Sequence, residues 1–297
     1  MRLSCGDKET LVNKIIAVAN QKGGVGKTTT SLNLSCYLAY FGRKTLLIDM
    51  DPQSNSTSGL GIEKTGIKYS TYDVLINNLP PEDAVIRATL DSLDVIPANR
   101  NLTGAEVELV NTISRETKLK KALSKFTAPY EFIIIDCPPS LGFLTVNALT
   151  AADSVLVPIQ AEFFPLEGLS ELMNTVNLIK EDLNPGLEIE GIVLTMYDPR
   201  LSLSSQVVEE IDKYFKNKVY QTVIPRNVRL AEAPSFGKPI LLYDSESKGA
   251  KAYGNLAREL LSRNGIELKE SSLKEKLKYP LTVRETVKTD ILVKDLT

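Results

Sequence analysis

NQKGGVGKTTT, residues 20–30, follows the apolar run 14–19 and opens into the helix-forming stretch 27–41. Glycines let a loop bend tightly, so that its backbone N–H groups and the N-terminus of the next helix can surround a phosphate chain. The lysine of such a loop reaches the β- and γ-phosphates, and the hydroxyl after it ligates Mg²⁺. A turn that only connects strand to helix is the alternative, but the strand, the Gly-Lys-Thr and the helix are all in place. The stretch therefore predicts a phosphate-binding loop made of Gly23, Gly24, Val25, Gly26, Lys27, Thr28 and Thr29.

Outward from this loop, short apolar runs alternate with amphipathic stretches. Several of the runs are almost continuous Ile, Val and Leu, which is typical of strands covered on both faces. We expect strands at 14–20, 44–50, 93–98, 130–137, 153–160, 188–196 and 219–225, and helices at 27–41, 114–126, 141–150, 166–182, 202–217 and 251–262. This alternation predicts an α/β fold of the P-loop NTPase type, with a mostly parallel twisted sheet and helices on both faces.

Composition excludes several classes of protein. The 297 residues carry 35 Lys and Arg against 37 Asp and Glu, a net charge of −2, so any contact with DNA has to come from a local patch. No histidine is present, which removes His-based triads and His-ligated zinc. Cys5, Cys36 and Cys137 show no CxxC spacing, so neither a disulfide framework nor an iron–sulfur carrier is indicated. The apolar runs are far shorter than the roughly 20 residues of a membrane span, and a soluble protein of a reducing cytoplasm is expected.

Carboxylates close two of the expected strands. Asp49 and Asp51 end the second run, and residues two apart on a strand share a face, so both can point toward the phosphates. Strand-end carboxylates that form turn or cap hydrogen bonds are the alternative. Pro52 and the Ser-, Asn- and Gly-rich loop after it favour a mobile switch segment. Asp136 closes IIID, and a rigid strand that presents one carboxylate to the water shell of Mg²⁺ has the geometry of a Walker B motif.

One feature separates the phosphate loop from the ordinary P-loop. The ordinary pattern requires glycine at position 21, where this chain has Gln21, and Lys22 follows to give KGGVGKT. This is the deviant Walker A motif, and it resembles the ParA/MinD family of ATPases. Further stretches are similar to the chromosomal ParA proteins: DMDPQSNSTSGLG, LTGAEVELV, DCPPSLGFLTVNALTAAD, LEGLSEL, LTMYDPR, VIPRNVRLAEAPSFGKPILLYD and SKGAKAYGNLARELL. The resemblance implies a ParA-type ATPase domain over 13–263. Residues 1–12 and 264–297 do not continue the alternation of strands and helices and are expected to be extensions, the latter partly helical.

The resemblance also implies the role of each site residue. Lys27 serves its own subunit, and Lys22 reaches across a nucleotide-sandwich dimer to the partner's phosphates. Asp51 orients the attacking water and shares the Mg²⁺ shell with Thr28 and Asp136. The turn at 224–227 is similar to the family's adenine-contacting turn, and Asp198 alone survives of a guanine-reading motif, which favours ATP. The expected base contacts are Met196, Pro225 and Asn227.

The implied function is ATP-dependent chromosome or plasmid partitioning in the cytoplasm, in association with the nucleoid. An ATP-bound homodimer binds double-stranded DNA without sequence preference, and a ParB-like partner stimulates hydrolysis. Arg200 and Arg229 match the family's DNA contacts, with Lys248 and Lys251 as further candidates. The chain departs from the family at positions 54 and 56 of the switch loop, where serines replace the usual Gly and Ala, and loop flexibility is expected to change.

Two other functions remain as alternatives. A MinD-like membrane ATPase needs a basic amphipathic helix near the C-terminus, and residues 266–278 carry apolar and lysine positions. Three glutamates dilute that charge and no aromatic residue anchors the apolar face, which disfavours the membrane function. A binding scaffold without turnover is disfavoured by the joint presence of Lys22, Lys27, Asp51 and Asp136.

Overall fold

The computed structural model describes residues 14–161, 165–201, 211 and 213–268. Within them, seven strands form a sheet in the order β3-β4-β2-β5-β1-β6-β7. All neighbouring strands are parallel except β3 and β4. The strands are β1 (Lys14–Val18), β2 (Thr45–Asp49), β3 (Ile86–Arg87), β4 (Leu93–Ile96), β5 (Phe132–Asp136), β6 (Ser154–Gln160) and β7 (Glu188–Thr195). The predicted fold class is confirmed.

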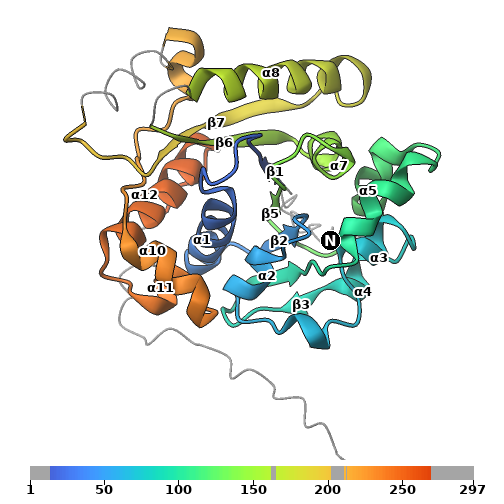
Figure 1. The fold of residues 1–297 in the computed structure, drawn as a ribbon. Helices are drawn as coiled ribbons and strands as arrows, with labels where there is room; N and C mark the ends of the chain where they lie inside the picture. The colour runs from blue at the N-terminus through green and yellow to red at the C-terminus, as the bar shows by residue number, and fades with distance from the viewer. Residues whose placement is uncertain (1–13, 162–164, 202–210, 212, 269–297) are drawn as a thin grey trace, which may run out of the picture.

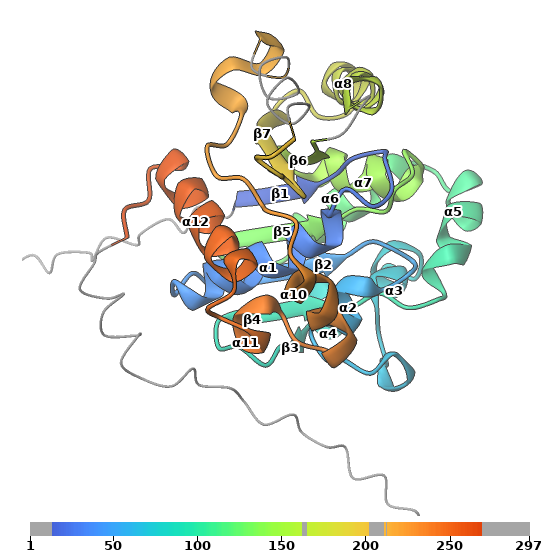
Figure 2. The ribbon, with the colours of Figure 1, turned by 60° about the vertical axis from the view of Figure 1, so that its left-hand side comes forward.

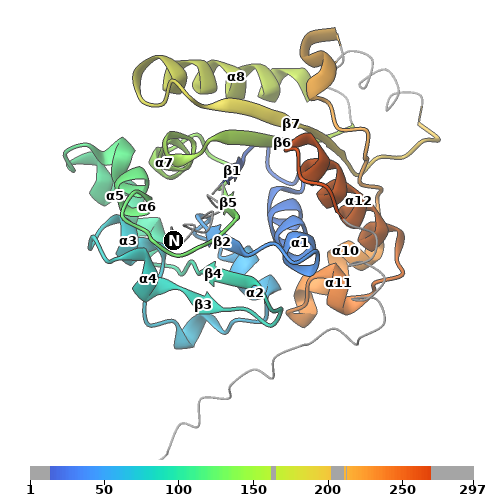
Figure 3. The same cartoon turned by 180° about the vertical axis from the view of Figure 1, so that it is seen from behind.

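Helices cover both faces of the sheet (Figures 1 and 3). One face carries α1 (Lys27–Tyr40), α10 (Val228–Glu232), α11 (Ile240–Tyr243) and α12 (Lys248–Arg263). The other carries α3 (Thr71–Leu75), α5 (Leu102–Val110), α6 (Lys118–Leu123), α7 (Phe143–Ala151) and α8 (Pro165–Asp182). Two short helices, α2 (Asn55–Gly59) and α4 (Pro81–Ala84), and the 3-10 turns η1 (Lys64–Gly66), η2 (Arg115–Thr117), η3 (Lys216–Lys218) and η4 (Ala233–Phe236) complete the described elements.

Each face of the sheet has its own apolar core, because successive side chains of a strand point to opposite faces. In β5, Ile134 packs against the α1 and α12 side, while Ile133 and Ile135 pack against the α7 and α8 side. All five residues of β2 and of β5 are buried. Apart from Thr45 at the start of β2, these two central strands are apolar until each ends in an aspartate, as expected of parallel strands covered on both faces.

The last helix follows its sequence pattern. Tyr253, Leu256, Ala257, Leu260 and Leu261 are all buried along one side of α12, at the i, i+3, i+4, i+7, i+8 spacing of an apolar stripe, within the helix expected at 251–262. The helix ends where Asn264 is the C-cap and Gly265 adopts a positive φ of 72°, a conformation that favours glycine. Beyond this stop, Ile266 and Leu268 still pack against the core under α12.

Two predicted elements differ in the structure. Residues 219–225 form no regular strand; they meet the last strand and its exit at the isolated bridges Ile192–Val219 and Tyr197–Pro225, and the Ile224 amide donates to the Leu194 carbonyl at 2.8 Å. Proline has no N–H, so Pro225 cannot donate to a strand ladder. The expected helix 114–126 is a 3-10 turn, η2, followed by the shorter α6.

Some expectations fall outside the described part of the chain. The expected helix 202–217 lies largely there, as do residues 269–278 of the stretch considered for membrane binding. Among the described residues, no helix combines the length and the apolar character needed to cross a membrane.

Candidate nucleotide site

Strands β1, β2 and β5 end at the same edge of the sheet, and β5 lies between the other two. The phosphate loop leaves β1 at this edge and enters α1 at Lys27 (Figure 2). Gly24 and Gly26 have φ angles of 76° and 87°, a conformation that favours glycine. Thr195, at the end of β7, donates its hydroxyl proton to the Val25 carbonyl at 2.8 Å. The loop is therefore braced from a second strand.

The two lysines of the loop lie in different surroundings. Lys27 is buried, and its Nζ donates to the Lys22 carbonyl at 3.0 Å, inside its own loop. Burial lowers the pKa of Lys27, and the charges of Asp136, Cys137 and Asp51 partly oppose that shift. Lys22 is exposed. The buried ammonium is thus placed to serve its own loop, while the exposed one is free to point away from the subunit.

Asp136 is held by hydroxyl groups from two helices. It ends β5, is fully buried, and accepts from Ser31 Oγ at 3.0 Å on Oδ1 and from Ser56 Oγ at 2.7 Å on Oδ2. Burial raises its pKa to about 6, and the Asp51 charge adds to this, while hydrogen bonds from Ser56, Thr28 and Ser31 act in the opposite direction. The structure thus brings Thr28 and Asp136 together, as the sequence predicts.

Asp49 and Asp51 differ in their surroundings: one makes the turn and cap hydrogen bonds, and the other lies toward the phosphate loop, the two alternatives that the sequence left open. Asp49 is fully buried and accepts from the Thr57 amide at 2.9 Å, the Thr57 hydroxyl at 2.7 Å and the Asp51 amide at 3.1 Å. Burial, with the charge of its register partner Asp136, raises the pKa of Asp49 to about 7. Asp49 therefore acts as a turn and cap residue that organises the loop.

Asp51 is the carboxylate of this loop that lies near the phosphate-loop lysine. One of its oxygens, Oδ1, accepts from the Gln53 amide at 2.9 Å. Its charge acts on the pKa values of both Lys27 and Asp136, which places Asp51 in the same cluster. The chain then enters α2 through Ser54, whose φ of 56° lies in the left-handed region that favours glycine.

The predicted base contacts lie on two adjoining segments. Met196 directly follows β7 and has a φ of 49°. The next residue, Tyr197, donates its amide proton to the Ile224 carbonyl at 3.0 Å and bridges to Pro225. Asn227 uses its side-chain oxygen to cap α10, accepting from the Leu230 amide at 3.3 Å, so its amide nitrogen is the group left to meet a ligand.

The two arginines predicted to contact DNA are exposed and carry carboxylate partners. Arg200 donates to Asp198 through Nε at 2.9 Å and through Nη2 at 2.6 Å, with its side chain 86% exposed. Arg229, 55% exposed, pairs with Glu232 at 3.0 Å and with Asp244 at 3.5 Å. Exposed pairs of this kind contribute little to stability, because water and salt screen both charges.

The residues of this site match a nucleoside triphosphate and Mg²⁺. Mg²⁺ prefers oxygen ligands and is usually held by one or two carboxylates together with substrate phosphates. Thr28, Asp51 and Asp136 supply such oxygens beside a loop of N–H groups and Lys27. The side-chain oxygen of Gln21 is buried without a hydrogen-bond partner. The sequence analysis identified Ser56 only as a departure from the family pattern and missed the supporting hydroxyls of Ser31, Thr57 and Thr195. Of these three, only Ser31, one helical turn after Lys27, carried a local signal.

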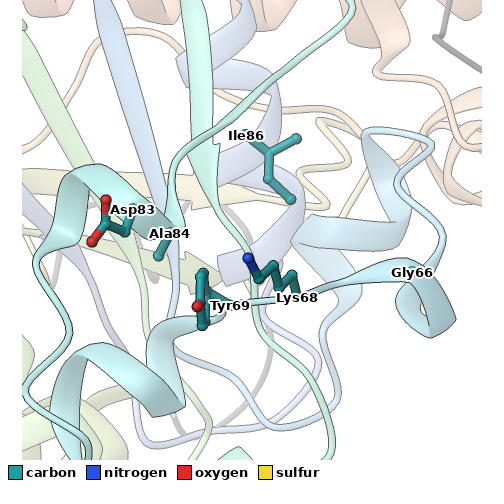
Figure 4. Close-up of a pocket in the computed structure, with 6 residues that line it drawn as sticks. All are labelled: Gly66, Lys68, Tyr69, Asp83, Ala84 and Ile86. Atoms are coloured by element: carbon teal, nitrogen blue, oxygen red, sulfur yellow. The ribbon is translucent and has the colours of Figure 1, made fainter. Parts of the chain in front are cut away.

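A separate hollow opens beside the edge strand β3 (Figure 4). Its volume is about 540 Å³, and no residue predicted from the sequence lines it. The lining residues are Gly66, Lys68, Tyr69, Asp83, Ala84 and Ile86.

Comparison with known proteins agrees with the geometry of the nucleotide site. Residues 13–189 match a family model described as an AAA domain. The sporulation initiation inhibitor protein Soj of Bacillus subtilis (strain 168) is 59% identical over 249 residues, which cover 84% of this chain and 98% of the relative. The chain belongs to the ParA/Soj family of chromosome-partitioning ATPases.

Other members and neighbours are consistent with the ParA/Soj family. The chromosome partitioning protein ParA of Myxococcus xanthus (strain DK1622) is 55% identical over 85% of this chain and 89% of its own length. A crystal structure from Mycobacterium smegmatis, named as cobyrinic acid a,c-diamide synthase with bound ATP analogue and magnesium, is 37% identical with a TM-score of 0.75. It covers 86% of this chain and 96% of its own.

Proposed function

We propose that this partitioning ATPase works as an ATP-closed homodimer that binds double-stranded DNA without sequence preference. A ParB-like partner stimulates hydrolysis, which opens the dimer and releases the DNA. The observation that carries the proposal is the contrast between the two loop lysines: Lys27 is buried against its own loop, and Lys22 is exposed beside it. The 59% identity to Soj over nearly all of that relative favours partitioning over the name carried by the mycobacterial neighbour.

The chemistry follows from the placement of these groups. Loop amides and Lys27 bind the β- and γ-phosphates of ATP, and Met196, Pro225 and Asn227 receive the base. Thr28, Asp51 and Asp136 hold Mg²⁺, which when bound neutralises charge on the phosphates. Asp51 orients the attacking water. Lys22 of the second subunit neutralises charge that develops on the transferred phosphoryl oxygens, which is the main task in phosphoryl transfer.

DNA binding is assigned to the exposed arginines. Arg200 and Arg229 release their carboxylate partners in exchange for phosphates, and Lys248 and Lys251 add further charge near the start of α12. Association with the nucleoid in the cytoplasm follows from such binding. Residues 13–263 are proposed as the ATPase domain, with 1–12 and 264–297 as extensions.

A mobility-shift experiment on random duplex DNA tests the proposal. The protein should retard DNA with ATP and fail to do so with ADP or without nucleotide, and light scattering should show a dimer only with ATP. Equal retardation in all three conditions would show that binding is not switched by ATP. Flotation with liposomes of full-length and tail-truncated protein tests the MinD-like alternative, which predicts that the full-length chain floats with the membrane.

A further inference from the structure

Ser56 holds the Asp136 carboxylate from the switch-loop side of the nucleotide site. Its Oγ donates to Asp136 Oδ2 at 2.7 Å across 80 residues of sequence, and both residues are fully buried. Ser31, on α1, has its Oγ 3.0 Å from the other oxygen and shares its one hydroxyl proton between that oxygen and the Lys27 carbonyl, also at 3.0 Å. Two hydroxyls from two different helices therefore fix the plane of one carboxylate.

The next residue makes the equivalent contact on the neighbouring strand. Thr57 donates to Asp49 through its amide and its hydroxyl, and Asp49 and Asp136 are register partners on β2 and β5. Through these hydrogen bonds the first turn of α2 contacts the last residue of both strands. Because α2 directly follows the loop that carries Asp51, the position of that loop and the orientation of Asp136 are tied together.

We propose that Ser56 is a positioning residue for Mg²⁺, which orients Asp136 and makes that orientation depend on the state of the Asp51 loop. The inference rests on the proposed function, in which Asp136 belongs to the Mg²⁺ shell. An ionised carboxylate offers about four lone-pair sites, so Asp136 can accept from both serines and still hold a metal-bound water. Removing a hydrogen bond that orients a metal ligand, from a group that does not itself contact the metal, typically lowers metal affinity by about 10–100-fold.

The variant Ser56→Ala tests this role with two measurements. The concentration of Mg²⁺ that half-saturates binding of a fluorescent ATP analogue should rise about tenfold or more. In nucleotide-free protein, amide hydrogen exchange at residues 55–60 should become about tenfold faster, because the first turn of α2 no longer has its hydrogen bond to a charged group. Alanine is smaller than serine and has a high helix propensity, so the variant is expected to fold.

Ser58→Ala is the matched control. Ser58 lies on the same helix, and its hydroxyl donates to the Ser54 carbonyl at 2.9 Å without touching a carboxylate. In Ser58→Ala, the Mg²⁺ concentration that half-saturates binding of the ATP analogue should equal that of the wild type. Unchanged behaviour of Ser56→Ala in both measurements, or an equal Mg²⁺ shift in the two variants, would overturn the positioning role. If the wild type binds the analogue without any need for Mg²⁺, the proposed function fails instead, and the exchange comparison still decides the Ser56 contact.

Discussion

Three aspartates meet at one edge of the sheet, and their surroundings give them different tasks. Asp49 and Asp136 are fully buried and hydroxyl-bonded, while Asp51 keeps a small exposed fraction of 6%. Asp51→Ala should retain ATP and accumulate the dimer, with phosphate release lowered by about 10²–10⁴, the range expected for a positioned proton or water partner. Single-turnover phosphate release beside light scattering measures both effects. Turnover close to wild type would show that another group orients the water.

The two loop lysines should separate binding from dimerisation. Lys27→Ala should abolish nucleotide binding, because the buried Nζ is the ammonium held inside its own loop. Lys22→Ala removes only an exposed side chain and keeps the carbonyl that Lys27 contacts. It should therefore retain appreciable monomer affinity for ATP and lose dimerisation and turnover. Titration with a fluorescent ATP analogue, alongside light scattering, checks this; equal loss of binding in both variants would contradict the role across the dimer.

Burial of Asp49 gives the folded chain a measurable pH dependence. The pKa of Asp49 is raised from 3.8 to about 7, so between these values the folded state holds a proton that the unfolded state has released. The free energy of unfolding must then fall as pH rises through this window. Asp49→Asn removes that proton uptake, so its melting temperature should fall less steeply with pH, even though weaker hydrogen bonding to Thr57 lowers it throughout.

Thermal melts of both proteins without nucleotide or Mg²⁺, from about pH 4 to about pH 8, provide the comparison. The quantity to compare is the slope of melting temperature against pH, because the melting temperature of the variant at any one pH also includes the effect of the altered hydrogen bonds. If melting temperature changes with pH in the same way in the two proteins, Asp49 is already ionised across this range in the folded state.

Among the elements, α2 connects the carboxylates to the segment that carries Arg229. Gly61, just after α2, and Gly237, just after η4, lie back to back: a Cβ added to Gly237 would be 2.9 Å from the Gly61 Cα. Gly237 also has a φ of 61°. Gly237→Ala should therefore lower the free energy of unfolding by about 2–3 kcal/mol, from overpacking and left-handed strain together.

Denaturant unfolding of Gly237→Ala measures this cost, and Gly66→Ala is its control. Gly66 ends the 3-10 turn η1, which follows α2, and an added Cβ there would meet no atom within 4 Å. The control should stay within about 0.5 kcal/mol of wild type. A destabilisation of Gly237→Ala no larger than that of the control would mean that the two glycine turns can separate freely.

Sequence reasoning succeeded where the signal is local. Strands β2 and β5 and helix α12 each begin and end within a few residues of their predicted bounds. It failed where an element is short or where the residues that hold it in place are distant in the sequence. Five-residue α2 has no periodic pattern, and its anchor, Asp136, is 80 residues away from Ser56. The run 219–225 is apolar enough for a strand, but its pairing with β7 amounts to isolated bridges.

For the whole molecule, the net charge of −2 means that DNA cannot be attracted by the overall field. In the proposed function, affinity for DNA comes from a small patch that includes Arg200 and Arg229, both exposed and paired with surface carboxylates. One subunit offers few phosphate contacts; a dimer doubles them, and linked contacts gain strongly through effective concentration. In the proposed function, dimerisation by ATP therefore acts as the switch for DNA binding.

Salt dependence measures the size of this patch. Removing one arginine–phosphate interaction should reduce the slope of log K against log salt by about 0.9, so two arginines in each of two subunits account for up to about 3.6 units. The double variant Arg200→Ala/Arg229→Ala should bind unrelated duplexes with equally reduced affinity, because phosphate contacts carry no base information. Its ATP-dependent dimerisation should survive, since neither residue lies in the phosphate loop. Tight, salt-resistant DNA binding by this variant would place the DNA surface elsewhere on the molecule, whereas a slope lowered on every duplex would assign it to these two arginines.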